Sequence, residues 1–577
     1  MAGTTLDLEH VLGADRVAVE IALQWDNWNS LRSKWVEEKK ELRNYLYATD
    51  TTTTSNKKLP WSNSTTTPKL TQIKDNLHAN YFAALFPQQV WMRWYGEDET
   101  SDTKFKKETI QSYMQNKVDQ SGFVDTCSIL LDDYIQYGNC FGYVAFERGY
   151  ITKETGEVIT SYIGPRLTRV SPFDIVFNPQ AATFEKTPKI IRSVVTLGEL
   201  KRMSDEGEDV DGVFNRAMSN RKAVLDSSDL SKSSGFIADG FSDIKQYYGS
   251  DYVEILTFFG DIYDKNTDTL MSDRIIKVVD RAYILSNVEN PSWYGTAPLF
   301  KAGWRDRPDN LYSMGPLDNL VGMQYRIDHL ENLASDVFDQ IALPMLKIRG
   351  NVEDFTQQPG ERIYVGEEGD VSYLHPDTTA LNADFKIDVL QNRMEEMAGA
   401  PRQAMGIRTP GEKTAFEVQT LQNSAGRIFQ HKTSHFERVF IEPILNTMLE
   451  VSRRNMDQEE VIRIDDSSSG TTIFDTITKD DILGKGKIRP LGARHFAERA
   501  QRVQNLSQMW QVKQTDPTVA AHLSGKMFAQ IMADELGEPG LFQENVAVEE
   551  QMQTQRMVTE GQVSAEGDQQ IAMENGL

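Results

Sequence analysis

Apolar residues recur at spacings of three and four between Leu320 and Ile341, which indicates an amphipathic helix with one buried stripe. The helix is expected over residues 317–342, because the proline at 344 removes a backbone donor and ends it. Charged side chains, among them Asp328 and Glu331, occupy its other faces. The predicted stripe consists of Leu320, Met323, Ile327, Leu330, Ala334, Val337 and Ile341.

After this helix the pattern changes to short strand signals separated by Gly and Pro. Strands are expected at 345–349, 362–365 and 371–374. A second helix is expected over 383–398, where Glu395 and Glu396 lie near its end. Its apolar side carries Phe385, Val389, Met394 and Met397.

A loop at 400–411 separates the second helix from a third. It contains two prolines and two glycines, which prevent either helix from continuing through it. The third helix opens with Thr409-Pro410-Gly411-Glu412, a capping box with proline at the first helical position. It is expected to reach about residue 454 and to kink at Pro443.

Four short runs in this order carry a family resemblance: VSPFDIVFNP at 170–179, LYSMGPLDNLVGMQ at 311–324, GEKTAFEV at 411–418 and FERVFIEPI at 436–444. They resemble the strand entering the wing, the approach to the stem, and the long helix after the tunnel loop in portal proteins, the head-to-tail connectors of tailed bacteriophages. The order of elements matches that family over roughly residues 10–510.

The resemblance implies an α+β fold with a mixed α/β wing, a two-helix stem, a β-containing clip and a helical C-terminal crown. The implied divisions are a wing at 1–310, the first stem helix at 311–343, the clip at 344–380, the second stem helix at 381–399, the tunnel loop at 400–411, the long kinked helix with a return to the wing at 412–492, and the crown and tail at 493–577.

The resemblance also implies a homo-oligomeric ring, a dodecamer, at one capsid vertex, through which double-stranded DNA passes during packaging and ejection. Implied partners are the terminase large subunit, the major capsid and scaffolding proteins, and tail adaptor proteins. The protein would be assembled in the host cytoplasm and reside in the virion. Three groups of residues follow: a tunnel loop with Arg402, Gln403, Ala404, Met405, Ile407 and Arg408; channel-facing stem carboxylates Asp328, Glu331, Glu395 and Glu396; and ring-packing Leu320, Ile327, Leu330 and Val337.

The loop can be interpreted in two ways. In a ring, Arg402 and Arg408 would form two circles of positive charge that touch passing phosphates and release them. In an ordinary interhelical turn, the same arginines would pair with Glu395, Glu396 or Glu412.

The remaining chain alternates helices and strands. A long helix with Trp25, Trp28 and Trp35 is expected over 5–48, followed by a polar loop at 49–67. Further expected elements are helices at 71–85, 103–118 and 124–137; strands at 138–146, 163–170 and 174–177; a peripheral insertion at 200–248; a β-meander over 252–285; and helices at 493–511 and 519–536. The tail at 545–577 has two interpretations, a frayed acidic segment or part of the crown.

The formal net charge of −24 argues against a protein that grips nucleic acid through a broad basic face. It is compatible with a conduit that lets DNA slide. Two cysteines, Cys127 and Cys140, are expected to be buried free thiols. No apolar run reaches the length of a membrane span and the N-terminus lacks a secretory signal, so a cytoplasmic protein without a membrane partner is expected.

The motifs of common enzymes are absent. The chain contains no G-x-x-x-x-G-K-[ST], H-E-x-x-H or G-x-S-x-G, and Gly484-Lys485-Gly486-Lys487 has the wrong spacing for a phosphate loop and suits a surface turn. His431 and His435 are spaced to share a metal, but no third ligand is evident nearby. We therefore expect no enzyme, no catalytic residue, no metal and no cofactor. The alternatives are another virion ring component, such as an adaptor or minor capsid protein, and a metal-dependent hydrolase using the two histidines.

Overall fold

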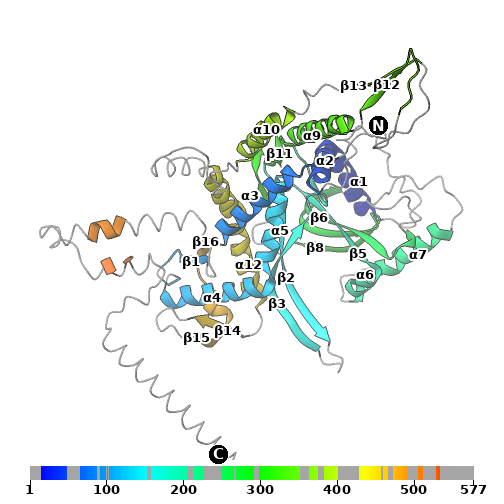
Figure 1. Cartoon of the computed structure of the whole chain (residues 1–577). Coiled ribbons are helices and arrows are strands. Elements are labelled where there is room, and N and C mark those ends of the chain that lie inside the picture. Colours follow the sequence, from blue (N-terminus) through cyan, green and yellow to red (C-terminus); the bar gives the residue numbers. More distant parts are fainter. Residues whose placement is uncertain are drawn as a thin grey trace, which may run out of the picture. The chain divides into compact units, whose positions relative to one another are not determined.

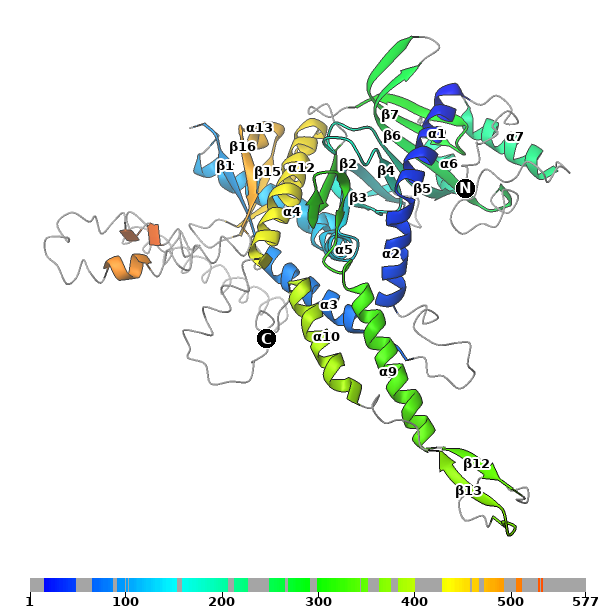
Figure 2. The same ribbon diagram turned by 90° about the horizontal axis from the view of Figure 1, so that it is seen from above.

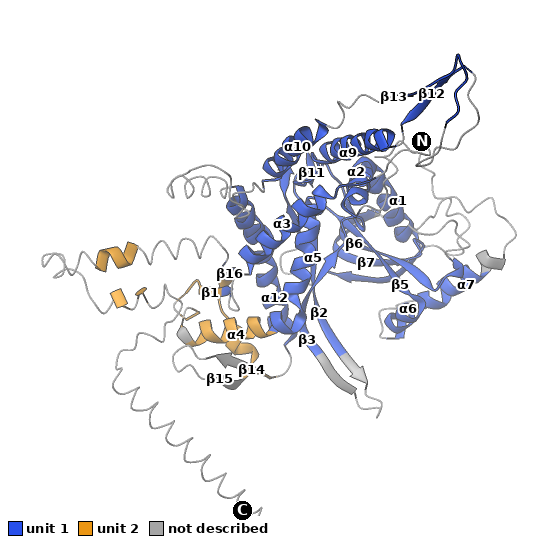
Figure 3. Ribbon diagram, in the orientation of Figure 1, with its two compact units in different colours: residues 1–92, 117–456, 488–492 blue, residues 93–116, 457–487, 493–577 orange. Residues whose placement is uncertain are grey.

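The computed structural model describes residues 15–47, 65–86, 91–98, 100–101, 103–152, 158–205, 212–226, 248–264, 268–290, 298–342, 344–350, 363–374, 382–399, 428–456, 459–465, 472–491, 505–510, 528–529 and 531–532. Helices and small antiparallel sheets are both present, so the α+β prediction is confirmed (Figure 1). The chain forms two compact units (Figure 3). Unit 1 comprises residues 1–92, 117–456 and 488–492, and unit 2 comprises 93–116, 457–487 and 493–577.

In unit 1 the predicted N-terminal helix is two helices, α1 (Arg16–Leu31) and α2 (Ser33–Leu46). They are interrupted at Arg32, whose backbone leaves helical geometry with φ −100° and ψ 2°. The buried Arg32 guanidinium donates hydrogen bonds to the carbonyl oxygens of Pro172 (2.8 Å), Ile175 (2.6 Å) and Phe173. Sequence periodicity misses this break because the carbonyls lie far along the chain.

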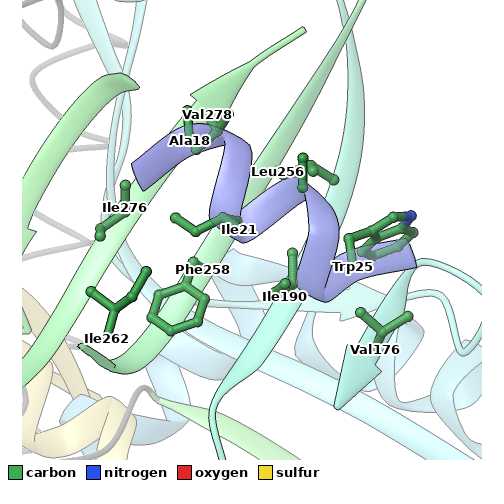
Figure 4. Close-up of a cluster of buried hydrophobic side chains, with 11 residues drawn as sticks. Ala18, Ile21, Trp25, Val176, Ile190, Leu256, Phe258, Ile262, Ile276 and Val278 are labelled. Carbon is green, nitrogen blue, oxygen red and sulfur yellow. The ribbon is translucent and has the colours of Figure 1, made fainter. Parts of the chain in front are cut away.

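A five-stranded antiparallel sheet lies under α1. Its strands, in order, are β4 (Ile175–Phe177), β5 (Lys189–Thr196), β6 (Tyr252–Asp264), β7 (Thr269–Val279) and β8 (Tyr283–Glu289). The predicted meander supplies the last three strands. The α1 residues Ala18, Ile21, Ala22 and Trp25, spaced for one helix face, pack on it with Val176, Ile190, Leu256, Phe258, Ile262, Ile276 and Val278 (Figure 4). Alternate strand residues form a second buried cluster with α6 (Leu197–Met203) and α7 (Val213–Asp226).

A three-stranded sheet of unit 1 has the order β3 (Val158–Val170), β2 (Asn139–Thr152), β9 (Leu299–Gly303). Both α5 (Phe123–Gln136) and α12 (Glu442–Asn455) contact β2 and β3. A Cβ added at Gly142 would lie 3.1 Å from the Phe440 ring, so the close approach of the third helix depends on glycine. Residues 428–436 are helical, a π-helical turn (Glu437–Ile441) follows, and Pro443 lies at the start of α12 directly after it, so its missing N–H coincides with the change in the helical hydrogen-bond pattern.

The helices that the resemblance assigns to a stem also belong to unit 1. The hairpin of β10 (Arg305–Arg307) and β11 (Asn310–Met314) leads to α9 (Val321–Ala342). This helix begins later than predicted, because residues 317–320 form a turn in which the Leu320 amide donates to the Leu317 carbonyl. The strands β12 (Met345–Arg349) and β13 (Asp370–Leu374) form a hairpin at the far end of α9 (Figure 2). Then α10 (Ala383–Ala398) returns beside α9.

The helix α3 (Lys69–Leu85) packs against α5 and contacts α9 and α10. The strand predicted at 362–365 is not formed, because within its described part only Val365 makes an isolated bridge. Both cysteines are buried and free, as predicted. Among the described helices, none combines the length and the apolar character needed to cross a membrane.

Unit 2 contains the hairpin of β14 (Glu460–Asp465) and β15 (Thr472–Ile477), and the short helix α13 (Lys479–Ile482). It also contains much of α4 (Lys104–Ser121). The strands β1 (Met92–Gly96) and β16 (Gly486–Pro490) form a two-stranded sheet. Residues 505–510 are helical, but most of the two predicted C-terminal helices and all of the tail at 545–577 lie outside the described residues.

Candidate functional site

One side of α9 carries three buried polar residues at intervals of one turn, Gln324, Asp328 and Asn332. They bind the backbone of an extended segment just before α3. The Asn332 side chain accepts from the Thr65 amide (2.6 Å) and donates to the Thr65 carbonyl (2.9 Å). Asp328 accepts from the Thr67 amide (3.0 Å), and the Gln324 amide group donates to the Thr67 carbonyl (2.5 Å). We call these three side chains the polar ladder.

A buried ion pair continues this attachment to the second stem helix. The Lys69 ammonium at the start of α3 lies 2.6 Å from the Glu395 carboxylate of α10, and both side chains are more than nine-tenths buried. Lys69 also donates to Gln72 (2.8 Å). The start of α3 therefore binds α9 through the polar ladder and α10 through Lys69.

A second buried lysine ties α2 to the approach to α9. The Lys39 ammonium donates to the Asp318 carboxylate. Burial lowers the pKa of Lys39, and the nearby Asp318 partly opposes that shift. The part of the stem next to the sheets is thus attached by paired buried charges, whose rupture leaves a charge without compensation.

These contacts correct the expectation that Asp328 and Glu395 face a channel. Both are buried within the subunit, Asp328 completely and Glu395 to 4% exposure. Burial raises the pKa of Asp328 to about 6, although hydrogen bonds from Thr67 and Gln324 oppose the rise. Its Oδ2 atom has no hydrogen-bond partner among the described residues. Of the other predicted carboxylates, Glu331 is half-buried and Glu396 is exposed.

The predicted ring-packing stripe of α9 is also largely used within the subunit. Leu320 and Ile327 are completely buried and Leu330 is 8% exposed, because α3 and α10 pack on this half of the helix. Val337 is half-buried. The expectation that a neighbouring copy buries Leu320, Ile327 and Leu330 is therefore wrong.

The other half of α9 has large apolar side chains in solvent. Leu333 is 42% exposed, Phe338 64% and Ile341 37%. On α10, Phe385 is 80% exposed and Met397 48%, whereas Met394 of the same predicted side is buried. Large contiguous patches of exposed apolar side chains are typical of interaction surfaces.

The hairpin β12–β13 has one apolar and one mostly polar face. Its register places Leu346 opposite Tyr373 and Ile348 opposite Val371, so these four side chains share one face. Ile348 and Tyr373 are each about half exposed. The other face carries the polar pairs Lys347–Ser372 and Arg349–Asp370 and, at the end next to the helices, the exposed apolar pair Met345–Leu374. Such alternation is typical of a strand pair with one covered face, yet no other described element packs substantially on this hairpin.

The tunnel-loop residues Arg402, Gln403, Ala404, Met405, Ile407 and Arg408 lie outside the described residues. Their proposed position and pairing therefore stay predictions.

The two histidines, His431 and His435, have different surroundings. His431 is exposed, whereas His435 Nε2 lies 3.6 Å from Asp306 Oδ2, and burial lowers the pKa of His435. Asp306 also accepts a hydrogen bond from the Ser313 hydroxyl (2.7 Å). No set of three potential metal ligands clusters anywhere in the described part of the chain.

Sequence reasoning missed the polar ladder, although its signal was present. Gln324, Asp328 and Asn332 recur every four residues and so share one helix face. Polar residues in that pattern usually mark a solvated face, and the segment that covers them is more than 250 residues away.

A scan of protein-family models finds no match to this chain, and a search of curated proteins finds no related sequence.

Proposed function

We propose that this chain is a non-enzymatic ring subunit of the portal type, assembling through α9, the β12–β13 hairpin and α10. The observation that carries the proposal is the apolar surface on the outer part of these elements. It includes Phe338, Ile348, Tyr373 and Phe385, which are each at least half exposed. Monomeric proteins rarely expose large apolar patches, so several exposed apolar side chains on adjoining elements favour association.

The topology of this region supports a ring rather than a chance patch. Two helices and the hairpin between them form one protrusion of unit 1, attached at its base by the polar ladder and the Lys69–Glu395 pair (Figure 2). A hairpin of two strands has little stability by itself and gains it from further packing. In a closed ring each copy would supply the cover for the next through heterologous contacts.

In this proposal the ring is a dodecamer at the capsid vertex of a virion, assembled in the host cytoplasm. Double-stranded DNA passes through its channel during packaging and ejection. The terminase large subunit, the tail adaptors, and the capsid and scaffolding proteins dock on it. The motor supplies the energy. The resemblance of runs 170–179, 311–324, 411–418 and 436–444 to portal proteins supports these assignments.

The ring is tested by native mass measurement and electron microscopy of the full chain at micromolar concentration. We expect closed rings with a central hole; stable wild-type monomers would contradict the proposal. The double variant Ile348→Ser/Tyr373→Ser removes apolar area from one hairpin face and should weaken rings without unfolding the subunit. The matched control Lys347→Ser/Arg349→Ser changes the other face of the same hairpin and should leave rings intact.

The channel loop is tested separately. Deleting residues 403–407 leaves the stem helices untouched, so rings should form while packaging or retention of DNA fails. Normal DNA content in particles built only from the deleted protein would show that this loop does not serve the channel.

A further inference from the structure

The Gly484-Lys485-Gly486-Lys487 run is not simply the expected surface turn, because it leads into strand β16. Two backbone hydrogen bonds fix how this strand meets β1: the Glu97 amide donates to the Lys485 carbonyl (2.8 Å) and the Leu491 amide to the Trp91 carbonyl (2.5 Å). In this antiparallel register Tyr95 lies opposite Lys487. Opposite residues of an antiparallel pair share a face.

A buried tryptophan lies against both glycines of the run, but only Gly486 is too close to it for a side chain. The Trp94 side chain is 1% exposed, and its indole N–H donates to the Ser101 carbonyl (3.1 Å). A Cβ on Gly486 would lie 2.6 Å from the Trp94 ring, and one on Gly484 would lie 3.4 Å from it. The inner side of the sheet therefore admits only hydrogen at position 486. Because strand side chains alternate, Lys487 points to the outer face.

The outer face combines cations with an aromatic ring. Lys485 and Lys487 are exposed, Tyr95 is 38% exposed, and Arg93 lies on the same face by alternation with buried Met92 and Trp94. Within the described part of the chain, none of these three cations forms an ion pair with another residue. We call Arg93, Tyr95, Lys485 and Lys487 the basic face.

Carboxylates border the basic face at one end. Glu97 lies opposite Lys485, and Asp98 follows it. The pKa of Asp98 is lowered chiefly by hydrogen bonds from Ser101 and Thr100, with Lys485 as a weaker contributor, so its carboxylate is engaged mainly within its own turn. Toward the other end, Lys487 and Tyr95 are exposed and Arg93 is half-buried.

We propose that the basic face contacts the phosphodiester backbone of nucleic acid without reading its sequence. Alternate residues of a strand are about 6.6 Å apart, which is comparable with the separation of consecutive phosphates on one nucleic-acid strand. Lysine binds phosphate as a point charge, and an exposed tyrosine beside it offers a surface on which an unpaired base can stack. The proposal does not depend on ring formation.

The rest of the chain sets the strength of this contact. With a net charge of −24, the protein as a whole carries charge of the same sign as nucleic acid. The basic face therefore binds weakly, at low salt, and releases readily as salt rises. An acidic protein could also pair with these lysines, but it has no bases to stack on Tyr95.

The test is fluorescence anisotropy of the full-length protein with a labelled mixed-sequence DNA single strand and its duplex, over a salt series. The double variant Lys485→Ala/Lys487→Ala should bind at least about tenfold more weakly at low salt. Its slope of log affinity against log salt should be smaller by about 1.4 to 1.8, since each lost phosphate contact removes 0.7 to 0.9. The control Lys34→Ala/Lys479→Ala removes the same charge from two exposed positions outside the face and should leave the slope unchanged.

Further variants and a competitor sharpen the result. Tyr95→Ala should weaken single-strand binding by about fivefold or more and duplex binding less, because base stacking contributes mainly to unpaired strands. Lys485→Gln/Lys487→Gln repeats the charge loss with longer polar side chains, in case the alanine variant does not fold.

The proposal is overturned if wild-type protein shows no salt-dependent binding, or if the lysine and control variants have the same slope. Displacement of DNA by polyglutamate at equal charge concentration would overturn it in favour of an acidic protein partner. Native mass measurement on the same samples separates this outcome from any failure of the ring.

Discussion

The two halves of α9 have similar apolar patterns but different surroundings. In the first half, Leu320 and Ile327 are completely buried and the polar ladder is bonded to residues 65–67. In the second half, Leu333 and Phe338 are exposed, and the hairpin that follows has an apolar face without a described cover. The first half of this helix is thus covered by the rest of its own chain, whereas the second half is left exposed.

This difference separates folding from assembly. Changes in the first half should alter the free energy of unfolding of the subunit, because buried charges and hydrogen bonds are broken there. Changes in the second half should alter association and leave folding nearly intact, since exposed positions contribute little to subunit stability. The following predictions test that separation, from the largest expected effect on unfolding to the smallest.

Glu395→Ala should lower the free energy of unfolding by about 3–5 kcal/mol, because it leaves the buried Lys69 ammonium without its partner. Denaturant unfolding of the purified chain measures the effect. The neighbouring exposed Glu396→Ala is the control and should stay within about 0.5 kcal/mol of wild type. Equal effects of the two variants would show that the base of the stem is not held by this pair.

Asp328→Asn should remove a pH dependence of stability. The pKa of Asp328 is about 6 in the folded chain and its ordinary value is 3.8, so the unfolded chain releases this proton first as the pH rises. The contribution of Asp328 to the free energy of unfolding therefore falls as the pH rises from about 4 to about 6, and it stays low at higher pH. Relative to wild type, the variant should gain at most about 3 kcal/mol above pH 6 and nothing below pH 4. A constant difference across the pH range would contradict this.

Asn332→Ala should cost about 1–3 kcal/mol, because it leaves the amide and carbonyl of Thr65 without their partner. Thermal unfolding and amide hydrogen exchange at Thr65 report on the same event. Protection at Thr65 that is unchanged in the variant would mean that the polar ladder does not hold this segment.

Phe338→Ser should change the unfolding free energy of the dilute subunit by no more than about 0.5 kcal/mol, since its side chain is already 64% exposed. The same variant should shift the ring-to-subunit equilibrium toward subunits in native mass measurements. A large loss of subunit stability would place Phe338 in a core and end the contrast between the two halves of α9.

The sequence by itself determined the local elements. Predicted helices at 71–85, 103–118, 124–137 and 383–398 agree within three residues with α3, α4, α5 and α10. The meander and the hairpin strands at 345–349 and 371–374 were predicted as well. These features depend on apolar spacing and on turn residues, which are properties of neighbouring positions.

The tertiary structure decided which faces of those elements are covered. Asp328 and Glu395 are residue types that usually lie on a solvated surface. In the folded chain, however, they are buried against Thr67 and Lys69, which belong to a segment far away in the sequence. The requirement for glycine at position 486 arises only because the Trp94 ring and the Tyr95 backbone lie against it in the folded chain. In each case the free energy of a side chain depends on partners brought together by folding, and periodicity along the chain carries no information about those partners.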